Sequence, residues 1–154
     1  METEDRRTVG TGSRVAALAL VVVLTGSLVL VAAPAARATG PCDFGRGEDQ
    51  GVRAYMRDVI RCAVDRWSVR GGPRTALCIA KRESGLLPWA ESSNGINKGL
   101  YQQHIDYWAN NYDTYTKPSW ALEKRILNGR TNAIVSIRMA HAGGWGPWGG
   151  SDCS

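Results

Sequence analysis

The clearest pattern along the chain is a helical repeat of apolar positions that begins at Val52. Apolar residues recur every three or four positions from there, at Val52, Tyr55, Met56, Val59, Ile60, Ala63, Val64 and Trp67. This spacing predicts an amphipathic helix with one buried face and an opposite face rich in arginine. Gly71-Gly72 should end this helix, because glycine favours non-helical backbone.

Four more helices are predicted beyond these glycines. Their expected ranges are 73–84, 102–110, 119–127 and 131–142. Pro73 suits the first turn of a helix, and glycine closely follows three of the four, at Gly85, Gly129 and Gly143. Residues 85–100 are rich in glycine and proline and predict an irregular loop or a short hairpin. No strand is strongly indicated, so the expected fold class is mainly α.

The first 38 residues have the pattern of an export signal. Arginines precede an apolar stretch over residues 15–33, and Ala36-Arg37-Ala38 forms a small-x-small cleavage pattern. The stretch is long for a signal peptide, so an uncleaved anchor is the alternative. The expected organisation is a signal peptide, a flexible arm and one folded domain, over residues 1–38, 39–50 and 51–154.

Cleavage after Ala38 leaves 116 residues with a net charge of +4. A chain of that length holds one modest hydrophobic core, which excludes a large barrel or a multidomain enzyme. Its basic residues form no cluster or motif of the kind that binds nucleic acid. We expect a secreted monomer that binds neither nucleic acid nor, after signal cleavage, the membrane.

The cysteine count predicts two disulfides. All the cysteines follow the predicted signal, at Cys42, Cys62, Cys78 and Cys153. The turn at Gly71-Gly72 is about equally far from Cys62 and Cys78, which favours that pair and leaves Cys42 with Cys153. No C-x-x-C pair occurs and the histidines are isolated, so we expect no metal site and no cofactor.

Glu83 is the first candidate for chemistry. It is the last or next-to-last residue of a predicted helix, near that helix's apolar stripe, so its carboxyl group is expected to be partly withdrawn from water. Desolvation favours the neutral acid, and a neutral carboxylic acid can protonate the leaving oxygen of a glycosidic bond. Taken alone, this stretch favours a solvated glutamate at a helix end, beside Lys81 and Arg82.

Three later segments add to Glu83-Ser84-Gly85. A Gly-Leu-Tyr-Gln run occupies residues 99–102, Asn132 lies at a helix start, and Gly144-Trp145-Gly146-Pro147-Trp148 precedes Cys153. In this order the segments resemble lytic transglycosylases of the soluble type and related bacterial lysozyme-like domains. The tail is similar to that of actinobacterial resuscitation-promoting factors. The resemblance spans residues 75–153 and implies a small, disulfide-stabilised lysozyme-like domain with a glycan cleft.

The family acts on the β-1,4 bond between N-acetylmuramic acid and N-acetylglucosamine, so the resemblance implies peptidoglycan glycan strands as the partner. It implies Glu83 as the catalytic acid, with Ser84 orienting it or lining the cleft. Gln102, with the backbone of Leu100 and Tyr101, would hold sugar amide groups.

The resemblance also assigns Asn132 a polar contact, although the family's Asn-Ile pair is Asn132-Ala133 here. A tyrosine that often follows in that helix is absent, and His141 is no evident replacement. Resuscitation-promoting factors pair a cysteine near the catalytic glutamate with a C-terminal cysteine, which implies Cys78–Cys153 as the alternative disulfide.

Lytic transglycosylases work with one carboxyl group, whereas hydrolysis normally needs two. Because no motif surrounds the later carboxylates Glu91 and Asp106, we expect one-glutamate chemistry at the cell wall. A hydrolytic muramidase and a non-catalytic cell-wall glycan-binding module are the alternatives. Tryptophan faces suit pyranose rings, and the candidates for the cleft rim are Trp89 and either Trp145 or Trp148.

Overall fold

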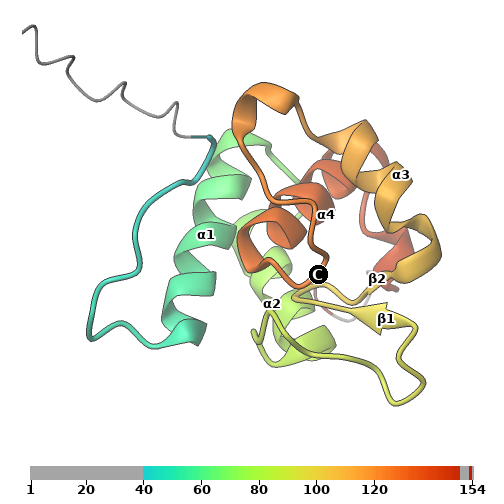
Figure 1. The fold of residues 1–154 in the computed structure, drawn as a ribbon, viewed down its shortest axis with the longest axis horizontal. Helices are drawn as coiled ribbons and strands as arrows, with labels where there is room; N and C mark the ends of the chain where they lie inside the picture. Colours follow the sequence, from blue (N-terminus) through green and yellow to red (C-terminus); the bar gives the residue numbers. More distant parts are fainter. Residues whose placement is uncertain (1–39, 150–152, 154) are drawn as a thin grey trace, which may run out of the picture. The chain divides into compact units, whose positions relative to one another are not determined.

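The computed structural model describes residues 40–149 and Cys153, which all belong to one compact unit. The signal peptide or anchor expected over residues 1–38 lies outside these described residues. The helices are α1 (Val52–Arg66), α2 (Gly72–Ser84), α3 (Ile105–Tyr115) and α4 (Gly129–Gly143) (Figure 1). Strands β1 (Asn97–Lys98) and β2 (Gln103–His104) form a short antiparallel hairpin. The described residues are therefore mainly α-helical, as predicted, and none of their helices is long and apolar enough to cross a bilayer.

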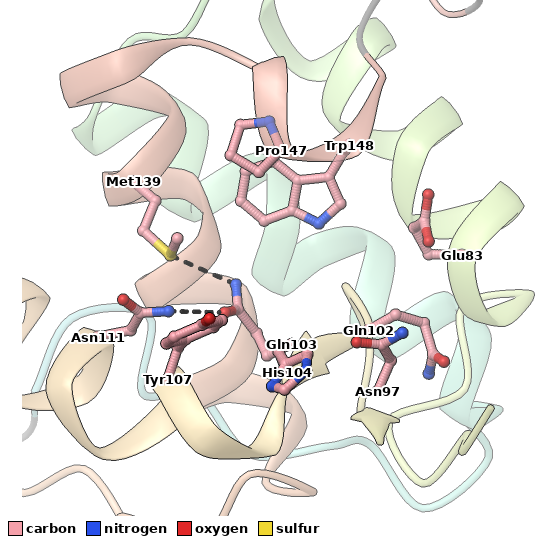
Figure 2. A pocket seen from close by; sticks show the side chains of 10 residues that line it. All are labelled: Glu83, Asn97, Gln102, Gln103, His104, Tyr107, Asn111, Met139, Pro147 and Trp148. Carbon is pink, nitrogen blue, oxygen red and sulfur yellow. Dashed lines mark hydrogen bonds between the residues drawn. The ribbon is translucent and has the colours of Figure 1, made fainter. Parts of the chain in front are cut away.

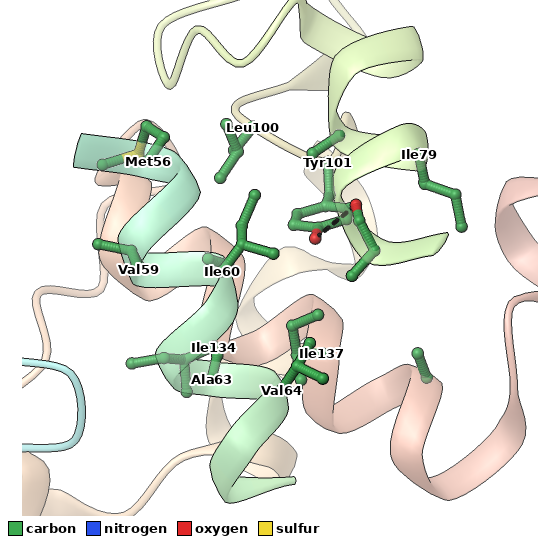
Figure 3. Packing of buried hydrophobic residues seen from close by; sticks show 14 of the residues in the cluster. Met56, Val59, Ile60, Ala63, Val64, Ile79, Leu100, Tyr101, Ile134 and Ile137 are labelled. Carbon is green, nitrogen blue, oxygen red and sulfur yellow. Dashed lines mark hydrogen bonds between the residues drawn. The ribbon is translucent and has the colours of Figure 1, made fainter. Parts of the chain in front are cut away.

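The core is built around α4. Helices α1 and α3 pack against α4, and α2 packs against α1. Residues 131–137 of α4 are all buried. Figure 3 shows Ile134 and Ile137 of α4 facing the apolar stripe of α1, with Leu100 and Tyr101 filling the space beside α2. Every apolar position predicted for the inner faces of α1 and α4 is buried or half-buried, which confirms the 3.6-residue pattern.

Two predicted boundaries are displaced. Helix α1 ends at Arg66, before the glycines, because Trp67 leaves helical backbone at φ −132° and ψ 90°. The helix predicted over 102–110 runs instead from Ile105 to Tyr115. Gln102 has a φ of 48°, in the left-handed region, and forms the turn between β1 and β2. The hairpin therefore extends past residue 100.

The helix predicted over 119–127 is wrong. Only Pro118–Trp120 forms a short 3-10 helix, and irregular backbone continues to Asn128. Side chains of α3 explain this, because they bind carbonyls that a helix would need. Trp108 Nε1 donates to the Lys124 carbonyl at 2.6 Å, and the Tyr112 hydroxyl donates to the Leu122 carbonyl at 2.6 Å. These bonds satisfy backbone acceptors without helical structure.

The disulfides join Cys42 to Cys62 and Cys78 to Cys153. The Cys62–Cys78 and Cys42–Cys153 pairing inferred from the glycine turn is wrong, and the Cys78–Cys153 pair implied by the family resemblance is confirmed. The reason is that each helical cysteine has a nearer partner. The N-terminal arm runs beside α1 (Figure 1), and the C-terminal segment returns to α2, where Thr75 Oγ1 donates to the Cys153 carbonyl at 2.9 Å.

The arm, residues 40–50, is non-helical but attached to the domain at its start. Beyond the Cys42–Cys62 disulfide, Arg130 Nε donates to the Pro41 carbonyl at 3.0 Å, and Arg130 Nη1 lies 3.3 Å from the Asp43 carboxylate. The Phe44 ring makes an edge contact with Tyr55, with ring centroids 5.8 Å apart. The arm therefore forms part of the surface beside α1.

The two disulfides should differ in their effect on stability. The Cys78–Cys153 bond closes a loop with a sequence separation of 75, against 20 for Cys42–Cys62. Loop-closure entropy then predicts a loss of about 4 kcal/mol for Cys78→Ala/Cys153→Ala and about 3 kcal/mol for Cys42→Ala/Cys62→Ala. Urea unfolding followed by tryptophan fluorescence measures both losses. A larger loss in the Cys42 and Cys62 variant would contradict this ranking.

Candidate active site

A polar pocket of about 340 Å³ opens between the end of α2, the β hairpin, α3 and the C-terminal segment. Its volume is within the usual range for small-molecule sites, roughly 300–1,000 Å³. Figure 2 shows Glu83 and Gln102 toward one end of the pocket and Asn111, Tyr107 and Met139 toward the other. Glu83 is the one acidic side chain among the described residues that line it.

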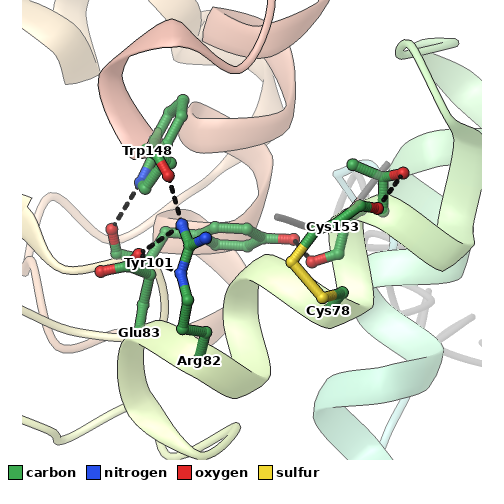
Figure 4. The surroundings of a disulfide bond; sticks show 8 residues. Cys78, Arg82, Glu83, Tyr101, Trp148 and Cys153 are labelled. Atoms are coloured by element: carbon green, nitrogen blue, oxygen red, sulfur yellow. Dashed lines mark hydrogen bonds and ion pairs between the residues drawn. A yellow bond between two sulfur atoms is a disulfide. The ribbon is translucent and has the colours of Figure 1, made fainter. Parts of the chain in front are cut away.

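Glu83 lies in the last turn of α2, which ends because Gly85 adopts left-handed backbone with a φ of 63°. Its side chain is 24% exposed, so it is partly withdrawn from water, as predicted. Arg82 Nη2 lies 3.0 Å from Glu83 Oε1, and Arg82 also donates to the Trp148 carbonyl (Figure 4). Adjacent helical residues do not normally face each other, but the long Arg82 side chain folds back to form this ion pair.

Trp148 forms the wall of the pocket beside Glu83. Its indole Nε1 donates to the Tyr101 carbonyl at 2.8 Å, and its ring makes edge contacts with Tyr101 and Trp145. The 3-10 helix Gly146–Trp148 carries it, and the Cys78–Cys153 disulfide attaches the chain end to α2. Trp148 is thus held by the bond and contacts of its own indole ring and, further along the chain, by the disulfide at Cys153.

Side-chain amides supply most of the remaining polar lining. Gln102 Nε2 donates to the carbonyls of Ala90 and Gly99 at 3.1 Å each, which holds the side chain across the loop. Gln103 is buried, donates to Ser136 Oγ at 2.8 Å and accepts from Asn111 Nδ2 at 3.1 Å. Amides both donate and accept hydrogen bonds. The bonds above use the Gln102 donor and both ends of Gln103, so a neutral ligand rich in hydroxyl and amide groups would meet lining amide atoms outside these bonds, such as those of Asn97.

His104 and Tyr107 form the aromatic side of the pocket. Their ring centroids lie 4.9 Å apart, and His104 Nδ1 accepts from the Asp106 backbone N–H at 3.2 Å as the N-cap of α3. Tyr107 is 63% exposed, which leaves its ring face accessible. These two rings offer apolar surface beside the amides, whereas Trp148, which also lines the pocket, is 8% exposed.

The predicted site residues divide into three groups. Glu83 and Gln102 line the pocket. Four others are buried or hydrogen-bonded behind it, and the structure gives them a supporting position instead of a lining one: Ser84, Leu100, Tyr101 and Asn132. Trp145 is also buried, and its Nε1 donates to the Arg70 carbonyl at 3.0 Å. Trp89 is 55% exposed and does not line this pocket.

The supporting residues converge on the turn at residues 98–101. Asn132 Oδ1 accepts from the Tyr101 N–H at 2.9 Å, and the Tyr101 hydroxyl donates to the Ala76 carbonyl at 3.0 Å. Ser84 Oγ donates to the Leu100 carbonyl at 2.7 Å. Complete burial raises the pKa of Tyr101, so the phenol stays protonated and keeps its donor role. The turn is therefore fixed by α2 and α4 together.

Sequence reasoning missed several lining residues, and it named Trp148 only as an alternative to Trp145. The ones missed are Asn97, Gln103, His104, Tyr107, Asn111, Met139 and Pro147. The displaced hairpin and α3 explain most of them, because their side chains face the pocket only in the observed register. Met139 lies in α4, whereas His141 Nδ1 lies 2.7 Å from the Ser68 carbonyl, away from this lining.

The other two carboxylates considered do not line the pocket. Glu91 forms a 2.9 Å ion pair with Lys98, and Asp106 is 75% exposed, with its carboxylate 3.8 Å from His104 Nδ1.

Comparisons with protein-family models, curated proteins and solved structures gave no significant match.

Asn132 should be essential for stability and for the shape of the pocket. Asn132→Ala removes the acceptor of the Tyr101 N–H and the donor to the Ile126 carbonyl in a fully buried place. Unsatisfied buried groups cost about 1–3 kcal/mol each, so we expect a loss of roughly 2–4 kcal/mol in unfolding free energy. Asn110→Ala, at an exposed position of α3, should change it by less than about 0.5 kcal/mol. Equal denaturation midpoints for the two variants would contradict the role given to Asn132.

Proposed function

We propose that this protein is a secreted lytic transglycosylase that cleaves the β-1,4 bond between N-acetylmuramic acid and N-acetylglucosamine in peptidoglycan, with Glu83 as acid and base. The observation that carries the proposal is one partly buried carboxyl group beside neutral amides and aromatic rings in a pocket. Hydroxyl and N-acetyl groups of a glycan match the amides, and pyranose rings match the aromatic faces. Two disulfides suit a small protein that folds in an oxidising compartment.

The proposed reaction proceeds in two proton transfers at one residue. Protonated Glu83 donates its proton to the glycosidic oxygen as the bond from that oxygen to the muramic C1 breaks. The C6 hydroxyl of the same muramic residue then attacks C1 and gives its proton to the Glu83 carboxylate. The product is a 1,6-anhydro sugar, no water is consumed, and the enzyme returns to its starting protonation state.

Arg82 leaves one oxygen of Glu83 for this chemistry. Both guanidinium contacts reach Oε1, and among the described residues no donor reaches Oε2. The reacting proton would therefore occupy Oε2, while Arg82 holds the carboxyl group in orientation through Oε1. Its further bond to the Trp148 carbonyl sets that orientation relative to the pocket wall.

Two alternatives remain as outcomes of the test. A muramidase would need a second carboxylate or an activated water, and the described lining supplies no second carboxylate. One observation, the Arg82–Glu83 ion pair, favours a non-catalytic glycan-binding module. A paired carboxylate can accept hydrogen bonds from sugar hydroxyls without donating a proton. The products of the reaction distinguish these functions.

Glu83→Gln should abolish cleavage and leave the fold intact. We expect the exported, disulfide-bonded protein to release anhydro-muropeptides from purified peptidoglycan, detected by mass spectrometry. Glutamine cannot supply a catalytic proton, so the rate should fall by at least about 100-fold. Glu48→Gln, the same change at an exposed position of the arm, serves as the matched control and should keep full activity.

The product pattern decides between the three functions. Anhydro products from the parent protein and Glu48→Gln alone support the proposal. Reducing ends would assign a muramidase, and sedimentation with peptidoglycan without any product would assign a binding module. Cleavage at the same rate by Glu83→Gln would refute Glu83 as the acid.

A further inference from the structure

A second pocket of about 430 Å³ lies between the arm, the start of α1 and the start of α4. It shares no described lining residue with the Glu83 pocket. Its charged side chains are Asp43, Arg46, Arg125 and Arg130, and Tyr55 lies beside them. Neither the sequence pattern nor the proposed glycan chemistry uses this group of residues.

The charge of this second pocket is strongly one-sided. Three guanidinium groups face one carboxylate, and Asp43 already pairs with Arg130 at 3.3 Å. Arg125 has an ion pair with Glu123 at 3.1 Å, but both side chains are more than half exposed, so that pair holds the guanidinium weakly. Arg46 and Arg125 are both exposed and able to turn toward a ligand. A net charge of two positive therefore lines a concave surface.

Neutral groups around the arginines also favour an anion. Burial raises the pKa of Tyr55, although Arg130 and Arg46 oppose that shift, so the phenol is protonated at neutral pH and can donate a hydrogen bond. Val52 and Gly129 line the pocket and begin the 15-residue helices α1 and α4. The first turns of α1 and α4, where a helix dipole is positive, therefore border the same space as the guanidinium groups.

We propose that this second pocket binds a phosphate group. A phosphate presents more acceptor oxygens than a carboxylate, and guanidinium forks match it with paired hydrogen bonds. Its charge of close to two negative also balances the net charge of the lining. The Cys42–Cys62 disulfide and the Arg130 bond to Pro41 keep Asp43 and Arg46 on the pocket wall, so the site is part of the folded domain.

The proposal is tested by titrating the exported, disulfide-bonded protein with inorganic phosphate at pH 8 and low salt, by isothermal calorimetry. Arg46→Ala/Arg125→Ala should weaken binding by about tenfold or more, because two charge-assisted contacts are removed. Arg57→Ala/Arg74→Ala is the matched control, since it lowers net charge equally at exposed positions outside the pocket. That control should bind within about twofold of the parent protein. Arg130 is left unchanged because its bonds support the arm.

Three further measurements, with dimethyl phosphate, with acetate and with Glu83→Gln, separate the sources of the phosphate and the competing explanations. Dimethyl phosphate binding as tightly as inorganic phosphate would indicate a phosphodiester in a polymer, and its failure to bind would indicate a terminal or free phosphate. Acetate binding as tightly as phosphate, or equal weakening in both double variants, would overturn the proposal. Glu83→Gln should bind phosphate as the parent protein does, so this result stands or falls independently of glycan cleavage.

Discussion

The hydrogen bonds from Asn132 to the turn at residues 98–101 are the constraint on which the site depends. Asn132 is fully buried in α4, and its amide binds the Tyr101 N–H and the carbonyls of Ile126 and Lys98. The turn can approach this closely only because Gly99 has no side chain. A Cβ there would collide with the Asn132 amide, and the φ of 83° is already unfavourable for other residues. The single buried amide of Asn132 therefore holds two non-helical segments in place, the turn at residues 98–101 and the irregular segment around Ile126.

The turn at residues 98–101 also positions three parts of the wall of the Glu83 pocket. Ser84 binds the Leu100 carbonyl and so fixes the end of α2 that carries Glu83. The Trp148 indole donates a hydrogen bond to the Tyr101 carbonyl. Gln102 directly follows the turn in the sequence, and its side chain lines the pocket. The Cys78–Cys153 disulfide and the hydrogen bond from Arg82 to the Trp148 carbonyl also join α2 directly to the C-terminal segment. These contacts hold the pocket wall around Glu83 from several sides, and the proposed role of Glu83 as a positioned proton donor would need such support.

The sequence predicted the helices that have a regular apolar stripe and missed the structure that depends on side-chain to backbone bonds. α1, α2 and α4 lie close to their expected ranges because burial alone determines their periodicity. The segment 119–127 has helical spacing, yet Trp108 and Tyr112 bind its carbonyls from another helix, which no local pattern reveals. Of the residues that the motifs indicate, Glu83 and Gln102 line the pocket. The motifs could not separate these from Tyr101 and Asn132, because a buried supporting residue and a ligand contact occupy equally specific positions in a motif.

The two pockets differ in charge in a way that fits two kinds of ligand. Among the described residues, the lining of the Glu83 pocket holds one carboxyl group, which is paired with Arg82, together with amides and aromatic rings, so it suits an uncharged sugar better than a strongly anionic ligand. In the lining of the second pocket, three guanidinium groups face one carboxylate, Asp43, which pairs with Arg130, so this surface suits an anion. The two proposed ligands, a neutral glycan and a phosphate, would therefore bind at surfaces that share no described lining residue. The disulfides support this division, because Cys42–Cys62 holds the wall of the second pocket and Cys78–Cys153 holds that of the first.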